Sequence, residues 1–182
     1  MPQKGLVDLL YVWKEICNIG VSAELEIWGE GELEAELLRL SEALNIRDSM
    51  IFRGYVGEVS SKLATMDVFV LPSYAEGNSN AILEAMVAGL PVVSTRVGGT
   101  AMMIGDKGGE LLFDAGDRES LKRNLLLLIN SQEKRKEMGE EMRNRIKYHF
   151  DIELVSTTYA KTYDLLLSGK REYVNAVSNS II

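Results

Sequence analysis

The chain has 182 residues, of which 46% are hydrophobic and 26% charged, and its formal net charge is -7. Such a composition is typical of a soluble globular protein, and the length suits one domain with a substantial core. The acidic balance argues against nucleic acid as a partner, because phosphate backbones are bound by clustered Lys and Arg. No apolar run reaches the roughly 20 residues that a membrane-spanning helix needs, so a cytoplasmic location is expected.

Short apolar and β-branched runs alternate with stretches of helical periodicity. The predicted strands are 25–28, 50–52, 68–71, 92–95 and 111–113. The predicted helices are 5–17, 32–44, 59–65, 80–88 and 118–129, followed by 132–148 and 152–167. This alternation predicts an α/β fold, a Rossmann-like doubly wound parallel sheet with helices on both faces. The domain is expected to cover residues 1–167, with 168–182 as a C-terminal tail.

Three residue types that often mark cofactor or metal sites are interpreted here as structural. The lone Cys17 has no partner for an internal disulfide, and its apolar neighbours predict a packed thiol. His149, the single histidine, ends a charged helix and is expected at the surface, because no second histidine could complete a metal site. Met86, Met102 and Met103 are expected to fill the core or pack loops. No metal and no cofactor are therefore expected.

The glycines after the first predicted strand do not form a dinucleotide site. Gly29-Glu30-Gly31 resembles the start of G-x-G-x-x-G, but the third glycine is absent, and the neighbouring glutamates would repel a pyrophosphate. A nicotinamide or flavin site at this turn is excluded.

Basic side chains gather late in the chain. They are Lys134, Arg135, Lys136, Arg143, Arg145 and Lys147. A solvated helix face is the simplest interpretation, and peripheral contact with a membrane surface or contact with a partner domain stays open.

The segment 75–93, AEGNSNAILEAMVAGLPVV, follows a strand at the edge where doubly wound sheets bind ligands. Gly77 permits a tight turn, and Asn78, Ser79 and Asn80 are each able to cap the helix that follows. The pattern therefore places a helix N-terminus, with unpaired N–H groups and partial positive charge, at the ligand edge. Such an end attracts phosphate.

Glu84 is the one acid among the apolar residues of this helix and is expected to be buried. A buried, unpaired carboxylate costs at least several kcal/mol, so something must hydrogen-bond to it. A protein donor, such as a backbone amide or an Arg, and a hydroxyl of a ligand are both open. Glu76, beside Gly77 in the preceding loop, would by itself be interpreted as a solvated acid.

Residues 67–99 resemble the donor-binding signature of the group 1 glycosyltransferases, the large retaining family 4, in which two acids are spaced E-x7-E as are Glu76 and Glu84. Four further segments fall in the family's order: 3–5 (QKG), 25–33, 51–56 and 109–121. The resemblance implies the C-terminal half of a GT-B fold of two facing Rossmann-like domains. It implies transfer of a sugar, with retention, from a nucleotide-sugar to a glycan or lipid-linked acceptor in surface polysaccharide or glycoconjugate synthesis.

The resemblance also implies residue roles. Glu84 would accept hydrogen bonds from the ribose, and Glu76 would face the donor sugar together with Lys4, whose charge would face the diphosphate. The backbone that would bind the sugar and diphosphate belongs to Gly77, Asn78, Ser79, Asn80 and Ala81. Residues 53–57 would border the nucleobase. Because a nucleoside diphosphate is already a good leaving group, Lys4 and the helix dipole would suffice without a metal.

The sequence departs from the family at its start and at Met102, where the family commonly has an acid after the glycine pair 98–99. The chain begins too late for the family's first strand, the Arg at its end and the N-terminal acceptor domain. A missing central strand should leave unpaired backbone between 25–28 and 68–71. The tail 172–182, or a second copy in a homodimer, is expected to compensate, and the fragment alone is expected to transfer nothing.

Two other functions stay open. One is a non-catalytic module that binds a nucleotide-sugar or takes part in assembly, and the other is a sugar-nucleotide epimerase on the same two-domain fold.

Overall fold

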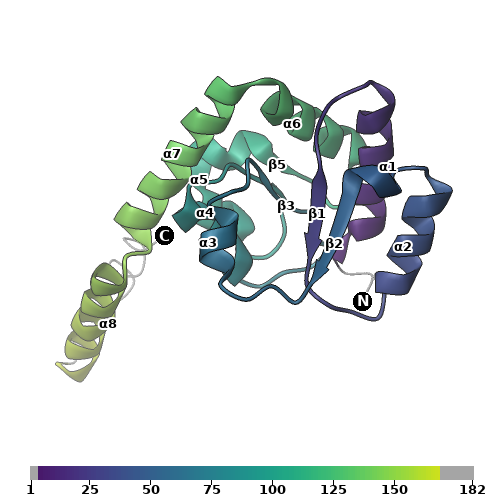
Figure 1. Ribbon diagram of the computed structural model, residues 1–182. Helices are drawn as coiled ribbons and strands as arrows, with labels where there is room; N and C mark the ends of the chain where they lie inside the picture. Colours follow the sequence, from purple (N-terminus) through teal and green to yellow (C-terminus); the bar gives the residue numbers. More distant parts are fainter. Residues whose placement is uncertain (1–3, 169–182) are drawn as a thin grey trace.

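The computed structural model describes residues 4–168 (Figure 1). The strands are β1 (Leu25–Trp28), β2 (Met50–Gly54), β3 (Phe69–Leu71), β4 (Val92–Thr95) and β5 (Leu112–Phe113). The helices are α1 (Leu6–Asn18), α2 (Glu34–Ala43), α3 (Val59–Leu63), α4 (Asn80–Ala88), α5 (Thr100–Gly108), α6 (Arg118–Asn130), α7 (Gln132–His149) and α8 (Ile152–Leu167). The predicted α/β class is confirmed.

The strands pair in parallel, as predicted, but they form two sheets instead of one. One sheet pairs β1 with β2, and the other has the order β3-β4-β5. Within residues 4–168 no strand joins β1 to β3, and this is the place where the sequence predicted an absent strand. We call the interval between β1 and β3 the seam. The prediction that the tail 172–182 fills it falls outside the described residues.

Both sheets belong to one layer, because their side chains enter the same two apolar clusters. The first cluster joins Ile27 of β1 and Val93 of β4 to the buried face of α1, including Leu10. The second joins Trp28 of β1 and Leu71 of β3 to helices α4, α5 and α7 on the opposite face. Neighbouring residues of a strand point to opposite faces, which accounts for the separation. Helices therefore cover both faces of the layer, as expected for a doubly wound fold.

The seam leaves apolar surface of β3 uncovered. All three residues of β3 are half-buried, whereas all four residues of β4 are buried. Strand β4 is paired on both sides and β3 only on one. The difference in exposure follows from this difference in pairing.

Helix α5 was not predicted from the sequence. Its nine residues begin directly after Gly99, and Gly105, at φ 75, interrupts the helical backbone. An interrupted segment this short lacks the two full turns of periodicity that identify a helix. The boundaries of the other elements agree with the predicted ones within two residues; β3, for example, begins at Phe69 and β5 at Leu112, each one residue later than predicted.

Helix α8 projects away from the rest of the molecule (Figure 1) and has no buried residue. Its exposed apolar side chains include Ile152, Tyr159, Tyr163 and Leu167. None of the helices within residues 4–168 is long and apolar enough to cross a membrane.

Candidate functional site

The loop between β3 and α4 lies at the carboxyl end of the strands, where ligands of such sheets bind. Glu76 in this loop accepts a hydrogen bond from Lys4, with 2.5 Å between Nζ and Oε1. The hydroxyl of Ser73 donates to the same oxygen, at 2.7 Å. Two predicted site residues, 72 positions apart in the sequence, are thus brought together.

The local environment of Glu76 favours the ionised form of its carboxylate. Burial raises its pKa, but the hydrogen bonds from Lys4 and Ser73 outweigh burial, so the pKa lies below its ordinary value. The side chain of Glu76 is 13% exposed and that of Lys4 is 56% exposed. Both printed contacts use Oε1, and no hydrogen bond from residues 4–168 reaches Oε2. The second oxygen is therefore available to a ligand.

Gly5 explains how Lys4 reaches the loop. Its φ is +63, and a Cβ at this position would lie 1.9 Å from the carbonyl oxygen of Pro72. Only glycine allows this approach, which brings the start of α1 against the end of β3. The Lys-Gly pair is thus a structural unit: Gly5 makes the contact and Lys4 supplies the charge.

The glycine pair before α5 supports the same loop from the other side. A Cβ at Gly98 would lie 1.9 Å from the carbonyl oxygen of Glu76, and one at Gly99 would lie 2.0 Å from Oδ1 of Asn78. The amide of Gly99 donates to the carbonyl of Gly77 at 3.1 Å. The pair 98–99 therefore shapes the backbone around Glu76 instead of binding a ligand through side chains.

Helix α4 begins without a side-chain cap. Its N-cap is Ser79, whose side chain makes no capping hydrogen bond, so the predicted capping by Asn78, Ser79 or Asn80 is not observed. The N–H groups of the first turn, including those of Asn80 and Ala81, therefore have no capping side chain as hydrogen-bond acceptor. An uncapped helix N-terminus beside Lys4 and the strand ends is suited to an anion such as a diphosphate.

The prediction that Glu84 is buried is wrong. Glu84 is exposed, and no hydrogen bond or ion pair joins it to residues 4–168. The buried face of α4 is formed by Ile82, Ala85 and Met86. At about 100° per residue, Glu84 lies on the opposite side of the helix from Ile82, so its apolar neighbours in sequence are not its neighbours in space. A protein donor is excluded among the described residues, which leaves solvent or a ligand.

The residue after β1 contacts the end of β2, at the carboxyl ends of these two strands. The amide of Gly29 donates to the carbonyl of Gly54 at 2.7 Å, and Arg53 pairs with Glu26 at 2.6 Å. The hydrogen bond from Arg53 holds the pKa of Glu26 below its ordinary value. Tyr55, in the loop predicted to border a base, is 81% exposed. Sequence reasoning named the segment but not this ring.

A second polar cluster, which the sequence did not reveal, joins three elements near Glu76. Asp8 of α1 accepts a hydrogen bond from the hydroxyl of Tyr74 and pairs with Arg118 of α6 at 2.6 Å. The hydrogen bond to Asp8 raises the pKa of Tyr74. Arg118 also lies over the ring of Tyr11, 4.5 Å from its centroid. The cluster ties the loop that contains Glu76 to α1 and α6.

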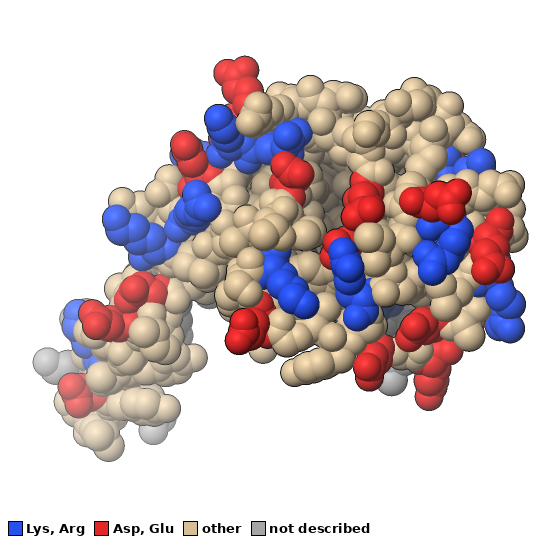
Figure 2. Space-filling model, in the orientation of Figure 1, with Lys and Arg blue, Asp and Glu red and all other residues tan. Residues whose placement is uncertain are grey.

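The late basic residues (Figure 2) are largely engaged within the protein. Lys134 pairs with Glu110, and Arg143 donates to the carbonyl of Ala88 at the end of α4. These bonds join α7 to a carboxylate and to the C-terminal end of α4, so the predicted solvated face is in part a structural one.

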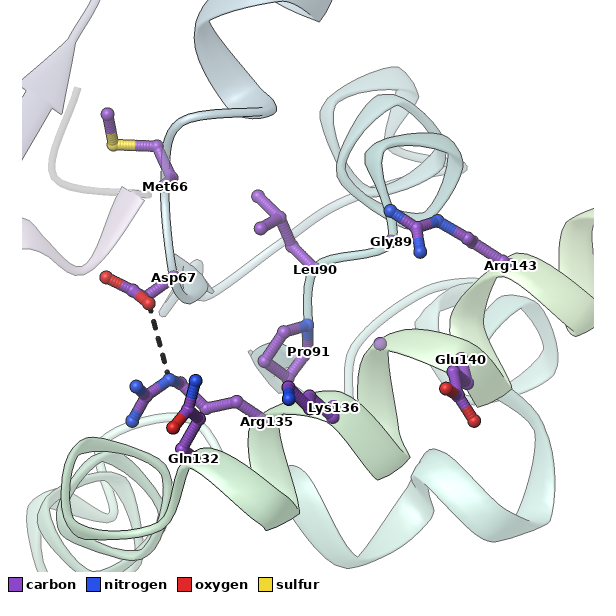
Figure 3. A pocket seen from close by; sticks show the side chains of 11 residues that line it. Met66, Asp67, Gly89, Leu90, Pro91, Gln132, Arg135, Lys136, Glu140 and Arg143 are labelled. Atoms are coloured by element: carbon purple, nitrogen blue, oxygen red, sulfur yellow. Dashed lines mark ion pairs between the residues drawn. The ribbon is translucent and has the colours of Figure 1, made fainter.

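The hollow drawn in Figure 3 lies between α7 and the segments that precede β3 and β4, at the amino ends of the strands. Its volume is about 280 Å³, and Arg135 there pairs with Asp67 at 3.4 Å. Its position is the opposite end of the sheet from Glu76, so the hollow is distinct from the candidate site.

The single residues that were interpreted as structural differ in how deeply they are buried. Cys17 is half-buried, with Sγ 3.4 Å from the hydroxyl of Ser49. His149 is half-buried, Met86 and Met103 are buried, and Met102 is 49% exposed, so Met102 does not fill the core. Among residues 4–168, no three His, Cys, Asp or Glu side chains are placed to hold a metal ion.

A family model described as "Glycosyl transferases group 1" matches residues 1–145. The chain belongs to this family of glycosyltransferases. It is 33% identical over 170 residues to an N-acetyl-alpha-D-glucosaminyl L-malate synthase of Bacillus anthracis, covering 92% of this chain and 44% of that protein. It is 30% identical over 135 residues to the lipopolysaccharide core biosynthesis glycosyltransferase LpsE of Rhizobium meliloti, covering 74% of this chain and 40% of that protein. The chain thus spans less than half the length of these relatives.

Solved structures share the fold. A mutant of S. aureus TarM in complex with fondaparinux, alpha-GlcNAc-glycerol and UDP has a TM-score of 0.81 at 21% identity, over 88% of this chain and 33% of that one. The C-terminal domain of the group 1 glycosyltransferase LpcC from Francisella tularensis has a TM-score of 0.75 at 19% identity, over 84% of this chain and 82% of that domain. The second match agrees with the predicted position of this chain as a C-terminal half.

Proposed function

We propose that this chain is the donor-binding half of a glycosyltransferase that transfers a sugar from a nucleotide-sugar to a glycan or lipid-linked acceptor. The observation that carries the proposal is the convergence of Lys4 and Glu76 beside the uncapped N-terminus of α4. Family membership and the UDP in the TarM structure support it. Since the matched family consists of transferases, the epimerase is not taken further.

Each part of a nucleotide-sugar has a counterpart in this arrangement. The diphosphate would lie over the first turn of α4, around Asn80 and Ala81, where amides and helix dipole favour an anion. The donor sugar would face Glu76 and the backbone of residues 77–79. The exposed carboxylate of Glu84 would accept hydrogen bonds from the ribose hydroxyls.

Lys4 has two roles in this scheme. Its ammonium group has three N–H donors, so it is able to keep its bond to Glu76 while a second N–H binds the diphosphate. As the sugar departs, negative charge develops on the leaving phosphate, and Lys4 and the dipole of α4 would stabilise it. Transfer is accordingly proposed to need no metal.

The remaining features of the whole enzyme are proposals that rest on the family. They are retention of configuration, an N-terminal domain that binds the acceptor, and action at the cytoplasmic side, with peripheral membrane contact or a homodimer as further options. Because the chain spans 44% of the N-acetyl-alpha-D-glucosaminyl L-malate synthase, we expect it to bind donor and transfer nothing by itself. A chain that binds no nucleotide-sugar at all would instead fit the alternative of a non-catalytic assembly module.

Isothermal titration calorimetry tests the proposal directly. The 182-residue chain is titrated with UDP-glucose, GDP-mannose and ADP-glucose, and in parallel with UDP, GDP and ADP. We expect one base to bind, and the Lys4→Met variant to lose affinity for the diphosphate of that base. A folded chain that binds none of the six compounds contradicts the proposal.

A further inference from the structure

Ser73 lies two residues after β3 and is fully buried. Its hydroxyl nevertheless contacts Glu76, the acid of the candidate site that other residues of the protein hold in place. Ser73 is 0% exposed, and its Oγ lies 2.7 Å from Oε1 of Glu76. A buried hydroxyl needs a hydrogen-bond partner, which in most proteins is a backbone group. Here the partner is the carboxylate of Glu76.

The backbone of Ser73 is itself fixed by the neighbouring strand. Thr95, also 0% exposed, donates from Oγ1 to the carbonyl oxygen of Ser73 at 2.6 Å. Thr95 is the last residue of β4, which is buried along its whole length. Thr95 thus fixes the backbone of Ser73, and the side chain of the same residue bonds Glu76.

Lys4 alone would not orient the carboxylate. Its side chain is 56% exposed, and a lysine ammonium on a flexible stem acts as a point charge without strong directional demand. The terminal torsion of a glutamate is broad and roughly two-fold, so its two oxygens exchange places at little cost. A short bond from a rigid buried donor removes this freedom.

We infer that Ser73, held by Thr95, is a positioning residue for Glu76: it assigns Oε1 to the pair with Lys4 and leaves Oε2 to the donor sugar. The inference rests on the proposed function in so far as the ligand is a nucleotide-sugar. Its consequence concerns selectivity between ligands. Ser73 contributes to binding of the sugar part, which touches Glu76, and contributes nothing to binding of the nucleoside diphosphate.

The experiment uses the full 182-residue chain and two single substitutions. Ser73→Ala removes the hydroxyl that reaches Glu76. Ser94→Ala is the matched control, because Ser94 is 1% exposed and its hydroxyl bonds the carbonyl of Leu71 at 2.9 Å without contacting Glu76. Thr95→Val, nearly equal in shape, loosens Ser73 without removing its hydroxyl.

The first measurement is independent of any ligand. In ¹³C-glutamate NMR titrations, with the Glu76 signal assigned from Glu76→Gln, we expect the pKa of Glu76 to rise in Ser73→Ala and to stay unchanged in Ser94→Ala. Thr95→Val should shift it in the same direction by less. Equal behaviour of Ser73→Ala and Ser94→Ala overturns the inference, even if no nucleotide binds and the proposed function fails.

The second measurement separates positioning from general loss of structure. With whichever nucleotide-sugar binds the wild type, Ser73→Ala should weaken binding about tenfold, the effect of one hydrogen bond to a charged group. Binding of the corresponding nucleoside diphosphate should change less than about twofold in the same variant, within the scatter that such effects show. A parallel loss for both ligands, or a loss of the same size in Ser94→Ala, refutes a positioning role.

Discussion

Gly98 lies so close to the backbone of Glu76 that a Cβ at position 98 would stand 1.9 Å from the Glu76 carbonyl oxygen. Its φ of +53 also disfavours any side chain. We therefore predict that Gly98→Ala displaces the loop that contains Glu76 and weakens nucleotide-sugar binding by about tenfold or more, because misplacement by an ångström is costly at such sites. Calorimetry on the purified variant measures the change.

The control for this prediction is Gly20→Ala. Gly20 has φ +77, and nothing lies within 4 Å of the added Cβ, so this variant suffers the backbone strain without the collision. It should lose stability and keep its affinity. If both variants lose affinity alike, the contact between Gly98 and Glu76 is not what shapes the loop.

A substitution of Glu84 is expected to weaken nucleotide binding without changing the stability of the fold. It is exposed and has no bond to the described residues, so Glu84→Gln should change the free energy of unfolding by less than about 0.5 kcal/mol. Loss of charge-assisted hydrogen bonds to the ribose, worth about 1.5–3 kcal/mol, should nevertheless weaken nucleotide binding at least tenfold. Urea denaturation and calorimetry give the two numbers. Glu42→Gln, which changes an exposed acid on α2, should alter neither.

The Lys4–Glu76 pair predicts a pH dependence of stability. The folded-state pKa of Glu76 lies below its ordinary value of 4.5, so its ionised form stabilises the fold above about that pH. The contribution is lost as pH falls through the folded-state pKa. Denaturation of wild type and Glu76→Gln should therefore differ near neutral pH and converge in acid. A difference that stays constant from neutral pH into acid would show that ionisation of Glu76 does not contribute to stability.

The elements and their order could be predicted from sequence because helix and strand periodicity is local. The burial of Glu84 was mispredicted because apolar composition was given more weight than helical phase: Ile82, Ala85 and Met86 define a face from which Glu84 is excluded. Helix α5 was missed because Gly105 breaks its short pattern. Both errors come from the interpretation of short-range sequence patterns, namely the phase of α4 and the interrupted periodicity of α5.

The contacts of the site are of another kind. Lys4 and Glu76 are 72 positions apart, and only family resemblance suggested that they share a site. Ser73 and Thr95 had no sequence signal beyond their place at strand ends, and the Asp8–Arg118 pair had none. Such partners are set by how strands and helices stack, which a single sequence does not encode locally.

Tyr55 is expected to contact the base. It is 81% exposed, the largest exposed fraction of any tyrosine among residues 4–168, and it lies in the loop that is expected to border the base. Stacking of a base on an aromatic ring is worth about 1–3 kcal/mol, so Tyr55→Ala should weaken nucleotide binding by about fivefold or more. Tyr159→Ala on α8, where the ring is 57% exposed, should have no effect. Calorimetry that shows equal affinities for both variants would exclude the contact.

The seam predicts which amides exchange with solvent. Strand β4 is paired on both sides, whereas β1 is paired only with β2 and β3 only with β4. Amides of β1 and β3 that face the seam have no ladder partner. Because the amide of Gly29 points to β2 and that of Phe69 points to β4, the alternating amides of Trp28 and Val70 point to the seam. Residue-resolved hydrogen exchange should therefore find Trp28 and Val70 less protected than Val93. Equal protection in all three strands would mean that the seam is already filled.

Repeating the exchange at several protein concentrations identifies what fills the seam. If a second copy pairs with β1 or β3, as a homodimer would, protection at the seam should rise with concentration while that of β4 stays constant. If protection does not change, the edges stay open in this chain, and a longer chain that supplies a strand before Lys4 should protect them at any concentration. The half-buried side chains of β3 would then become buried, and the unfolding temperature should rise with the added apolar contact.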